Sequence, residues 1–467
     1  MVIAAVLIGL IVAGFWPEST YVNTEPSPEV AASVLAAQKA MEGYTDATTM
    51  VFADPVIETA ICRRLGKEKG TVTVGDMRTI RSFKYPDVYE KSDEKDIGYS
   101  IKTLEDFRYC ENLESIEANR QLIDNLESLR CLKKLNKIDL SFNRISDLSP
   151  LADMGSLHTL FVSYNPIRSI KGLRGQKSIV TIDIKYCPIT DISPLEGMDT
   201  LQALYMGEDS HYDSLFSRLF QRNQPATGQG SLDKPQEYDL SALGNTSRLK
   251  YFHLIGKPKD IAPLLGHKGL EIVELEGLES GDFAALMENC KELMLITLKS
   301  SSIRMSSLAS IGDKMYGLII SNSDITGDAP VLPCPTNMNT LTIANCNVSD
   351  ISALAGLTKL ETLALVRSEI KDITPLAGLK ALKLLYLHSN KIEDITPLTG
   401  LKTLTRLDLQ ANSISDFTPL LDLPALKHLG AENNPYADDN AFRELEMRGC
   451  EVEYGYNSLY GGVEEAN

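Results

Sequence analysis

The sequence predicts an elongated α/β solenoid, in which short parallel strands form one continuous sheet and short helical segments return the chain behind it. At 467 residues, the chain exceeds the size at which a single globular core usually stops growing. A 22-residue period places Leu360, Leu382 and Leu404 at the same point of successive segments. Because only 7% of the residues are aromatic, with a single Trp, we expect the core to be aliphatic.

One segment, which we call a coil, shows how the chain folds. In "KALKLLYLHSNKIEDITPLTGL", which begins at Lys380, Leu385 and Leu387 face one way and Tyr386 faces the other, as in a short strand. The motif Asp-Ile-Thr-Pro-Leu at 394–398 predicts a tight turn into a short helical segment. One coil cannot bury its aliphatic side alone, whereas stacked coils share a continuous core.

A column of small polar residues follows the strands. A buried side-chain amide such as that of Asn390 can satisfy the backbone N–H and C=O groups that point inward where the chain leaves the strand. We therefore interpret Cys187 and Cys346 as members of this ladder, and not as nucleophiles, metal ligands or disulfide partners. The ladder consists of Asn143, Asn165, Cys187, Ser301, Ser323, Cys346, Ser368, Asn390, Asn412 and Asn434.

The repeats occupy residues 80–434 and are interrupted in three places. About 11 extra residues lie in the first coil, a longer insertion spans about 208–237 on the rim after a strand, and Lys257 and Leu278 stand at ladder positions. We expect the middle coils to turn differently there.

The regions outside the repeats have distinct predicted roles. The apolar run in residues 1–16 predicts a signal peptide or an N-terminal membrane anchor. No Lys or Arg precedes this run, so a start codon placed too late and a buried core helix remain alternatives. Residues 17–50 are predicted to be a linker, residues 51–79 an N-terminal helical cap, and residues 435–467 a C-terminal cap and tail.

The coil pattern L-x-x-L-x-L-x-x-N-x-I, followed by D-I-x-P-L, resembles the leucine-rich repeat. The 22-residue length and Asp-Ile-Thr-Pro-Leu are similar to the bacterial internalin-like family. The resemblance implies a horseshoe with the parallel sheet on its concave face, helical or 3-10 segments on its convex face, and binding of host or neighbouring-cell proteins. Because no LPxTG-type sorting signal or wall-binding repeat follows the coils, we do not expect covalent wall attachment or an invasin role.

Charge and motifs exclude several classes of function. The net charge of −17 argues against nucleic-acid binding, and we expect contact with a membrane only through the N-terminal segment. The chain has no GxSxG, HExxH or Gly-rich phosphate loop, and its six histidines are dispersed, so we predict no enzymatic activity, no cofactor and no metal. Glu208, Asp209, His211 and Asp213 are grouped, but we interpret them as an ordinary polar loop instead of a metal site.

Outward-facing strand positions are the candidate binding residues, because packing does not dictate their identity. Aromatic side chains on a rigid scaffold anchor protein interfaces and also stack on sugar rings. For the column Phe142, Tyr164 and Tyr186, an intramolecular stack along the rim is the alternative to ligand binding. The candidates are Phe161, Tyr164, Tyr186, Tyr205, Tyr251, His253, Tyr386, His388 and Arg406.

The sequence therefore predicts a secreted or surface-tethered binding protein, extracellular or at the cell surface. Its expected ligand is a protein that contacts the concave face and the inserted rim loop. The alternative is a cell-envelope carbohydrate-binding protein that uses Phe161, Tyr164 and Tyr205 as stacking platforms.

Overall fold

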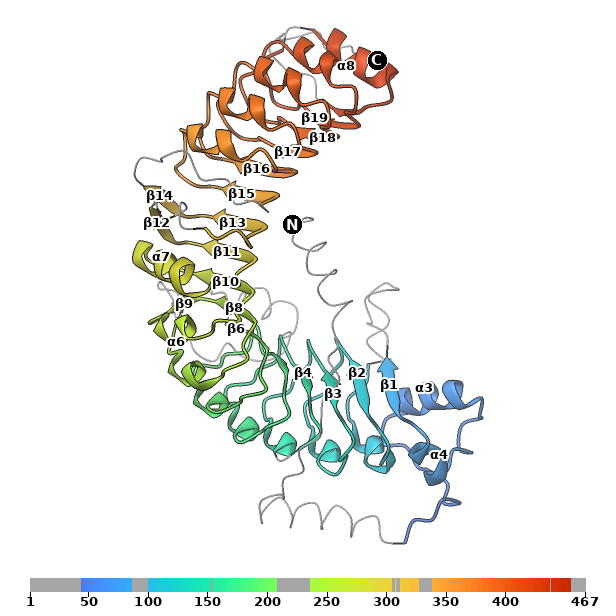
Figure 1. Cartoon of the computed structure of the whole chain (residues 1–467). Helices are drawn as coiled ribbons and strands as arrows, with labels where there is room; N and C mark the ends of the chain where they lie inside the picture. The colour runs from blue at the N-terminus through green and yellow to red at the C-terminus, as the bar shows by residue number, and fades with distance from the viewer. Residues whose placement is uncertain are drawn as a thin grey trace, which may run out of the picture.

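The computed structural model shows a curved solenoid with its strands on the inner side and its helices on the outer side (Figure 1). It describes residues 43–85, 100–152, 154–207, 236–304, 307, 311–326, 338–436 and 438–454. Within these residues, 16 strands form one sheet in which every adjacent pair is parallel. The predicted solenoid with a parallel sheet on its concave face is confirmed.

Each strand of the long sheet is short. The long sheet contains β1 (Ser82–Tyr85), β2 (Ser115–Ala118), β3 (Lys137–Asp139), β4 (Thr159–Phe161), β5 (Thr181–Asp183), β6 (Ala203–Gly207), β8 (Tyr251–Ile255), β10 (Ile272–Glu276), β11 (Leu295–Lys299), β13 (Gly317–Ser321), β15 (Thr340–Ala344), β16 (Thr362–Val366), β17 (Leu384–Tyr386), β18 (Arg406–Asp408), β19 (His428–Gly430) and β20 (Glu451–Glu453).

The helical segments on the outer side begin at the predicted turns. In the Asp-Ile-Thr-Pro-Leu motif, the Asp394 carboxylate accepts a hydrogen bond from the Thr396 N–H at 2.8 Å, and a 3-10 helix starts at Thr396. Asp372 and Asp416 form the same turn. The 3-10 helices are η3 (Glu105–Tyr109), η4 (Glu127–Leu129), η5 (Ser149–Leu151), η6 (Lys171–Leu173), η7 (Ser193–Leu195), η8 (Ser241–Asn245), η10 (Ser352–Gly356), η11 (Thr374–Gly378), η12 (Thr396–Gly400) and η13 (Thr418–Asp422).

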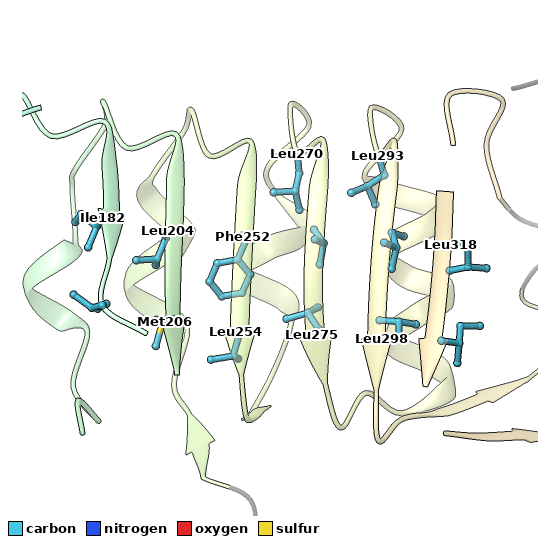
Figure 2. Packing of buried hydrophobic residues seen from close by; sticks show 14 of the residues in the cluster. Ile182, Leu204, Met206, Phe252, Leu254, Leu270, Leu275, Leu293, Leu298 and Leu318 are labelled. Carbon is cyan, nitrogen blue, oxygen red and sulfur yellow. The ribbon is translucent and has the colours of Figure 1, made fainter. Parts of the chain in front are cut away.

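The core lies between the sheet and the outer segments and runs the length of the solenoid. Figure 2 shows how Leu204, Phe252 and Leu275 from neighbouring strands point to the same side of the sheet. These side chains are at most 1% exposed. Since each coil lends one row of aliphatic side chains, the coils are stable only when they are stacked.

The ladder behaves as predicted. The Asn390 amide oxygen accepts hydrogen bonds from the backbone N–H groups of Ser368 and Ile370, both at 3.1 Å. Its amide nitrogen donates to the carbonyls of Leu365 at 2.7 Å and Leu387 at 2.8 Å. One side chain thus satisfies backbone groups of two adjacent coils.

Some ladder members differ from asparagine. The Cys187 thiol donates to the Val162 carbonyl, at 3.3 Å. Gln121, which the sequence analysis missed, is 1% exposed, and its amide oxygen accepts from the Ile101 N–H at 3.0 Å.

The coils with Lys257 and Leu278 turn differently, as expected. Lys257 lies in β9 (Lys257–Pro258), which pairs with β7 (Glu237–Tyr238) in a separate two-stranded sheet. Leu278 is buried and leads into an α-helix. These coils carry α6 (Ala262–Leu265) and α7 (Ser280–Asn289), and the following coils carry the parallel pair β12 (Ser302–Arg304) and β14 (Asp324–Thr326).

Two helices, α3 (Pro55–Leu65) and α4 (Val74–Arg78), precede β1 and lie beside that end of the sheet (Figure 1). Ile57 and Ile61 of α3 are fully buried in the common core. The Asp54 carboxylate accepts from the Val56 N–H at 2.9 Å and from the Lys102 N–H at 2.7 Å. It therefore joins the start of α3 to the first coil.

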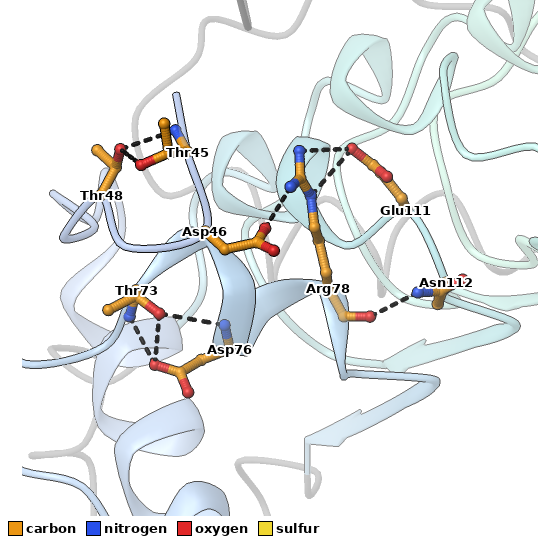
Figure 3. A network of polar contacts seen from close by, with 8 residues as sticks. All are labelled: Thr45, Asp46, Thr48, Thr73, Asp76, Arg78, Glu111 and Asn112. Carbon is orange, nitrogen blue, oxygen red and sulfur yellow. Dashed lines mark hydrogen bonds and ion pairs between the residues drawn. The ribbon is translucent and has the colours of Figure 1, made fainter. Parts of the chain in front are cut away.

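Polar contacts hold the chain before α3 against α4 (Figure 3). Arg78 forms ion pairs with Asp46 and with Glu111, the latter at 3.1 Å. Thr73 and Asp76 form a capping box at the start of α4. Residues 43–50 are the described part of the predicted linker, and they pack here, with Met50 only 6% exposed.

The C-terminal end contains the predicted helix, turn and strand. α8 (Asn440–Met447) is followed by Gly449, whose φ of 84° lies in the left-handed region, and then by β20, which pairs with β19. The predicted signal peptide or anchor at 1–16, most of the linker and insertion, and the end of the tail lie outside the described residues.

Candidate binding surface

The strand register places one outward side chain of each coil in a single row across the concave face. We call it the middle row. In the described residues it begins with Lys84 and ends with Glu453. Between them it contains Glu117, Asp139, Phe161, Asp183, Tyr205, His253, Glu274, Thr297, Ile319, Thr342, Ala364, Tyr386, Asp408 and Gly430.

Phe161 lies between Asp139 and Asp183 in the middle row. Burial raises the pKa of the Asp139 carboxyl, and it does the same for Asp183, although Lys185 acts in the opposite direction. The Lys185 ammonium is 3.8 Å from the Asp183 carboxylate and lies 5.2 Å above the ring of Tyr205. This part of the surface therefore combines aromatic rings with partly desolvated carboxyl groups.

At the centre of the row, Tyr205 and His253 are neighbours with ring centroids 6.2 Å apart. The His253 Nδ1 is 3.0 Å from a carboxylate oxygen of Glu274, and Lys299 pairs with the other oxygen. Burial raises the pKa of Glu274, but the contacts with His253 and Lys299 outweigh it and lower the pKa to about 2. The Nε2 atom of His253 is buried and has no hydrogen-bond partner within the described part of the chain.

Tyr251 lies on β8 two residues before His253, in the outward-facing row next to the middle row. Its hydroxyl donates to the Glu271 carboxylate at 3.0 Å, and burial and the nearby carboxylate raise its pKa to about 12. The same outward row contains Ile272 and Leu295, and Met294 beside Leu295 is 38% exposed. Strand alternation places Ile272 and Leu295 outward, although Leu295 is only 7% exposed.

The aromatic column Phe142, Tyr164 and Tyr186 is an intramolecular stack. The ring centroids of Phe142 and Tyr164 are 3.9 Å apart and those of Tyr164 and Tyr186 are 4.2 Å apart, with nearly parallel planes. The guanidinium of Arg120 covers Phe142 at 4.1 Å. Since Tyr164 lies between two rings, both of its faces are occupied, and it does not offer a platform for a sugar ring.

The stacked residues also have an uncommon backbone conformation. Arg120, Phe142, Tyr164 and Tyr186 have φ between 54° and 60°, a region that asparagine and glycine enter most readily. Ala411 occupies the corresponding position of a later coil with φ of 52°. The sequence analysis did not foresee this conformation, because the aromatic residues conceal the usual Asn or Gly signal.

Three candidates lie near the C-terminal end of the face. Arg406 of β18 lines a pocket there. Tyr386 lies on the neighbouring strand β17, and His388 follows it two residues later on the same face. Tyr386 is the register neighbour of Asp408. His388 is half-buried, and its Nδ1 is 3.4 Å from the hydroxyl of Ser389. The pocket is lined by Arg406, Leu407, Asp408, Gln410, His428, Leu429, Gly430, Glu451 and Glu453.

The nine candidates therefore fall into three groups. Phe161, Tyr205, Tyr251 and His253 share the central part of the concave face. The side chains of Tyr164 and Tyr186 form the rim stack, and Tyr386, His388 and Arg406 lie near the C-terminal pocket. The sequence analysis did not include Gln410, Glu451 or Glu453 among the candidates, and the repeat register would have found Gln410.

Other kinds of site have no geometry in the described residues. No group of three or more His, Cys, Asp or Glu side chains there is arranged to hold a metal ion. None of the described helices is both long and apolar enough to cross a membrane. The grouped acidic residues and His211 of the insertion lie outside the described residues.

Comparisons with known proteins agree with the fold. Residues 133–175 match the family model for leucine-rich repeats in two copies. The comparison with curated proteins finds no relative of this sequence.

Several solved structures resemble the chain. An internalin of Listeria monocytogenes, inlF, has 23% identity and a TM-score of 0.59, with 83% of this chain and 96% of that chain covered. A leucine-rich-repeat protein of Leptospira interrogans has 14% identity and a TM-score of 0.54, with 80% and 100% covered. The plant peptide hormone receptor RGFR1, solved in complex with RGF2, has 17% identity and a TM-score of 0.51, with 76% and 58% covered. Residues 133–175 thus carry leucine-rich repeats, and the described chain folds as a solenoid similar to that of the internalin inlF.

Proposed function

We propose that the protein is an exported, non-enzymatic binding protein. Its concave face, together with the inserted rim loop, engages a partner protein outside the cell or at the cell surface. The observation that carries this proposal is the middle row, in which Phe161, Tyr205, His253 and Tyr386 stand on a rigid sheet with no other layer of the described chain above them.

The composition of the face supports a protein partner. Interfaces between proteins have aromatic and apolar residues at their centre and charged residues towards their edge. Here the uncharged stretch Thr297, Ile319, Thr342 and Ala364 lies between two charged groups, one around Glu274 and one around Asp408. The plant peptide hormone receptor RGFR1, which has a similar fold and was solved in complex with RGF2, gives a precedent for ligand binding on this fold.

Carbohydrate binding is the alternative proposal, and the structure restricts it. Because the faces of Tyr164 are covered by Phe142 and Tyr186, only Phe161 and Tyr205 remain of the three expected platforms. The Tyr205 ring already lies under the Lys185 ammonium.

The proposed function is tested by crosslinking the full-length protein on its native cells and identifying the captured partners. A photoactivatable residue at position 342, in the middle row, should capture a protein, whereas one at the exposed position 393, outside the strands, should not. Capture of nothing from position 342 would contradict the proposal.

A glycan array separates the two proposals. Binding of envelope sugars that is lost in Tyr205→Ala and kept in Tyr164→Phe would support the carbohydrate alternative. Tyr164→Phe is the matched control because it keeps the ring stack and removes only a hydroxyl.

A further inference from the structure

Among the histidines of the described chain, His267 alone is fully buried, with 3% of its surface exposed. It follows α6, and its backbone N–H donates to the Leu264 carbonyl at 3.0 Å. Its Nε2 atom is 2.9 Å from the carbonyl oxygen of Leu243, which lies in η8 of the preceding coil. Because a carbonyl oxygen can only accept, Nε2 carries the hydrogen, and Nδ1 of the neutral ring is bare. The side chain therefore joins two coils through one hydrogen bond.

The Nδ1 atom of His267 is buried and has no hydrogen-bond partner within the described part of the chain. The elements packed against α6 are η8 on one side and α7 on the other. Cys290, which follows α7, is the other titratable group that is buried here. Its thiol donates to the Leu264 carbonyl at 3.8 Å, and burial raises its pKa to about 11, so it stays neutral and offers no counter-charge.

The charged side chains on these elements and on the adjoining turns supply no acceptor for Nδ1 either. Four of them are exposed, namely Arg248, Lys268, Glu288 and Lys291. The others cap helices: Asp239 accepts from the Ser241 N–H, Asp260 accepts from the Ala262 N–H, and Glu279 and Asp282 form the capping box of α7.

A positive charge on the His267 ring would therefore be costly in the closed structure. A protonated imidazole donates from both nitrogens, and the second N–H would meet no acceptor in a buried site. Burial lowers the pKa of His267 below its ordinary value of 6.5, although the hydrogen bond to Leu243 acts in the opposite direction. A ring that opens to water takes up a proton at its ordinary pKa. The stability of the closed form is thus complete above about pH 6.5 and falls as the pH decreases.

The segment that contains His267 leads directly into the centre of the concave face. The Leu270 N–H donates to the His267 carbonyl at 3.0 Å, and β10 begins two residues later. β10 carries Glu274, which contacts His253 on β8. An opening of residues 262–270 would therefore loosen the start of a strand that forms the middle row.

We propose that His267 is an acid-sensitive switch: protonation of its ring in mild acid opens residues 262–270 and loosens the start of β10. The switch depends on the proposed function only in its consequence, because the loosened strand belongs to the proposed binding surface. Acid then weakens the hold of this surface on a partner.

Hydrogen exchange followed by mass spectrometry, on the full chain at pH 7.5 and 5.5, tests the switch. The observed rate of each peptide is divided by its chemical exchange rate at the same pH, which leaves the equilibrium constant for opening. Since the open form titrates at the ordinary pKa of 6.5, this constant should rise about tenfold for residues 262–270 between the two pH values. Peptides from residues 392–404, in a distant coil, should change by less than about twofold.

His267→Gln is the main variant, because it removes the titration and keeps an N–H for the Leu243 carbonyl. Gln176 provides the precedent at the corresponding position of an earlier coil, where it is 4% exposed and donates to the Leu151 carbonyl at 2.7 Å. His267→Leu is a second variant, for which Leu357, Leu379 and Leu401 are the precedents. His388→Gln is the matched control, because it removes a half-buried ring from another coil.

The acid response of residues 262–270 should be lost in both His267 variants and kept in His388→Gln. Far-ultraviolet circular dichroism confirms that each variant is folded. A rise of less than about threefold in the native protein, a full rise in His267→Gln or an equal loss in His388→Gln would overturn the inference. These measurements use the protein without a partner, so they are independent of the crosslinking experiment, whose failure at pH 7.5 would contradict the proposed function alone.

Discussion

Replacement of Asn390 by alanine should be one of the most destabilising single changes in the solenoid. The substitution removes two acceptor contacts, to the N–H groups of Ser368 and Ile370, and two donor contacts, to the carbonyls of Leu365 and Leu387. Asn390 is only 8% exposed, so water does not readily replace its amide. The N–H groups of Ser368 and Ile370 and the Leu365 carbonyl lose the partner that Asn390 provides, whereas the Leu387 carbonyl keeps the Asn412 amide at 3.0 Å.

The magnitude follows from the count of these groups. An unsatisfied buried polar group costs about 1–3 kcal/mol, so three groups at the low end give a loss of about 3 kcal/mol in the free energy of unfolding. Asn390→Ser should lose less, about 2 kcal/mol, because a hydroxyl keeps part of the hydrogen bonding. Serine already occupies the same column at Ser368, where its hydroxyl donates to the Val366 carbonyl at 3.1 Å.

Hydrogen exchange followed by mass spectrometry tests this prediction coil by coil. In Asn390→Ala, peptides that contain the amides of Ser368 and Ile370 should exchange faster, while peptides from 100–152 should not change, because coils interact mainly with their neighbours. Glu393→Ala, at an exposed position of the same coil, is the control. Equal effects of Asn390→Ala and Glu393→Ala would refute the role that we assign to the ladder.

Three further predictions concern other parts of the chain. Contacts with His253 and Lys299 lower the pKa of Glu274 from 4.5 to about 2, so its contribution to stability is complete above about pH 4.5 and is lost as the pH falls through 2. The difference in unfolding free energy between the native protein and Glu274→Gln should therefore shrink over this range in urea titrations. Ala411→Gly, at φ of 52°, should raise the unfolding free energy by about 0.5–1 kcal/mol, whereas Ala344→Gly, within a strand, should lower it, as thermal denaturation will show. Asp54→Ala should lower the unfolding free energy by about 2–3 kcal/mol, because four backbone N–H groups lose their acceptor. It should also make residues 43–65 more sensitive to limited proteolysis. Unchanged cleavage would argue against a role for Asp54 in holding α3.

The repeat period made most of the fold predictable. Once Leu360, Leu382 and Leu404 were in register, the inward faces, the ladder and the turn at each Asp-Ile-Thr-Pro-Leu motif followed from strand alternation and turn chemistry. The period also located the coils at Lys257 and Leu278 that depart from the pattern. It did not show that they would be completed by α-helices and two small extra sheets, because that choice depends on packing against neighbouring coils.

The candidate site was predictable to a smaller extent. Outward residues such as Phe161, Tyr205 and His253 were correctly placed in one row, since the row is a direct consequence of the register. The contacts between these residues were not predictable. The pairing of His253 with Glu274 joins residues 21 positions apart on adjacent strands, and only the register of β8 and β10 brings them together.

By itself, the sequence determined which side chains are buried, because a 22-residue period and strand alternation assign each aliphatic residue to the core. Only the tertiary structure decided what the remaining side chains do. It turned the faces of Phe142, Tyr164 and Tyr186 towards one another, and it paired His253 with Glu274. The physical reason is that burial is a property of each coil, whereas contacts on the surface depend on the distance and twist between neighbouring coils.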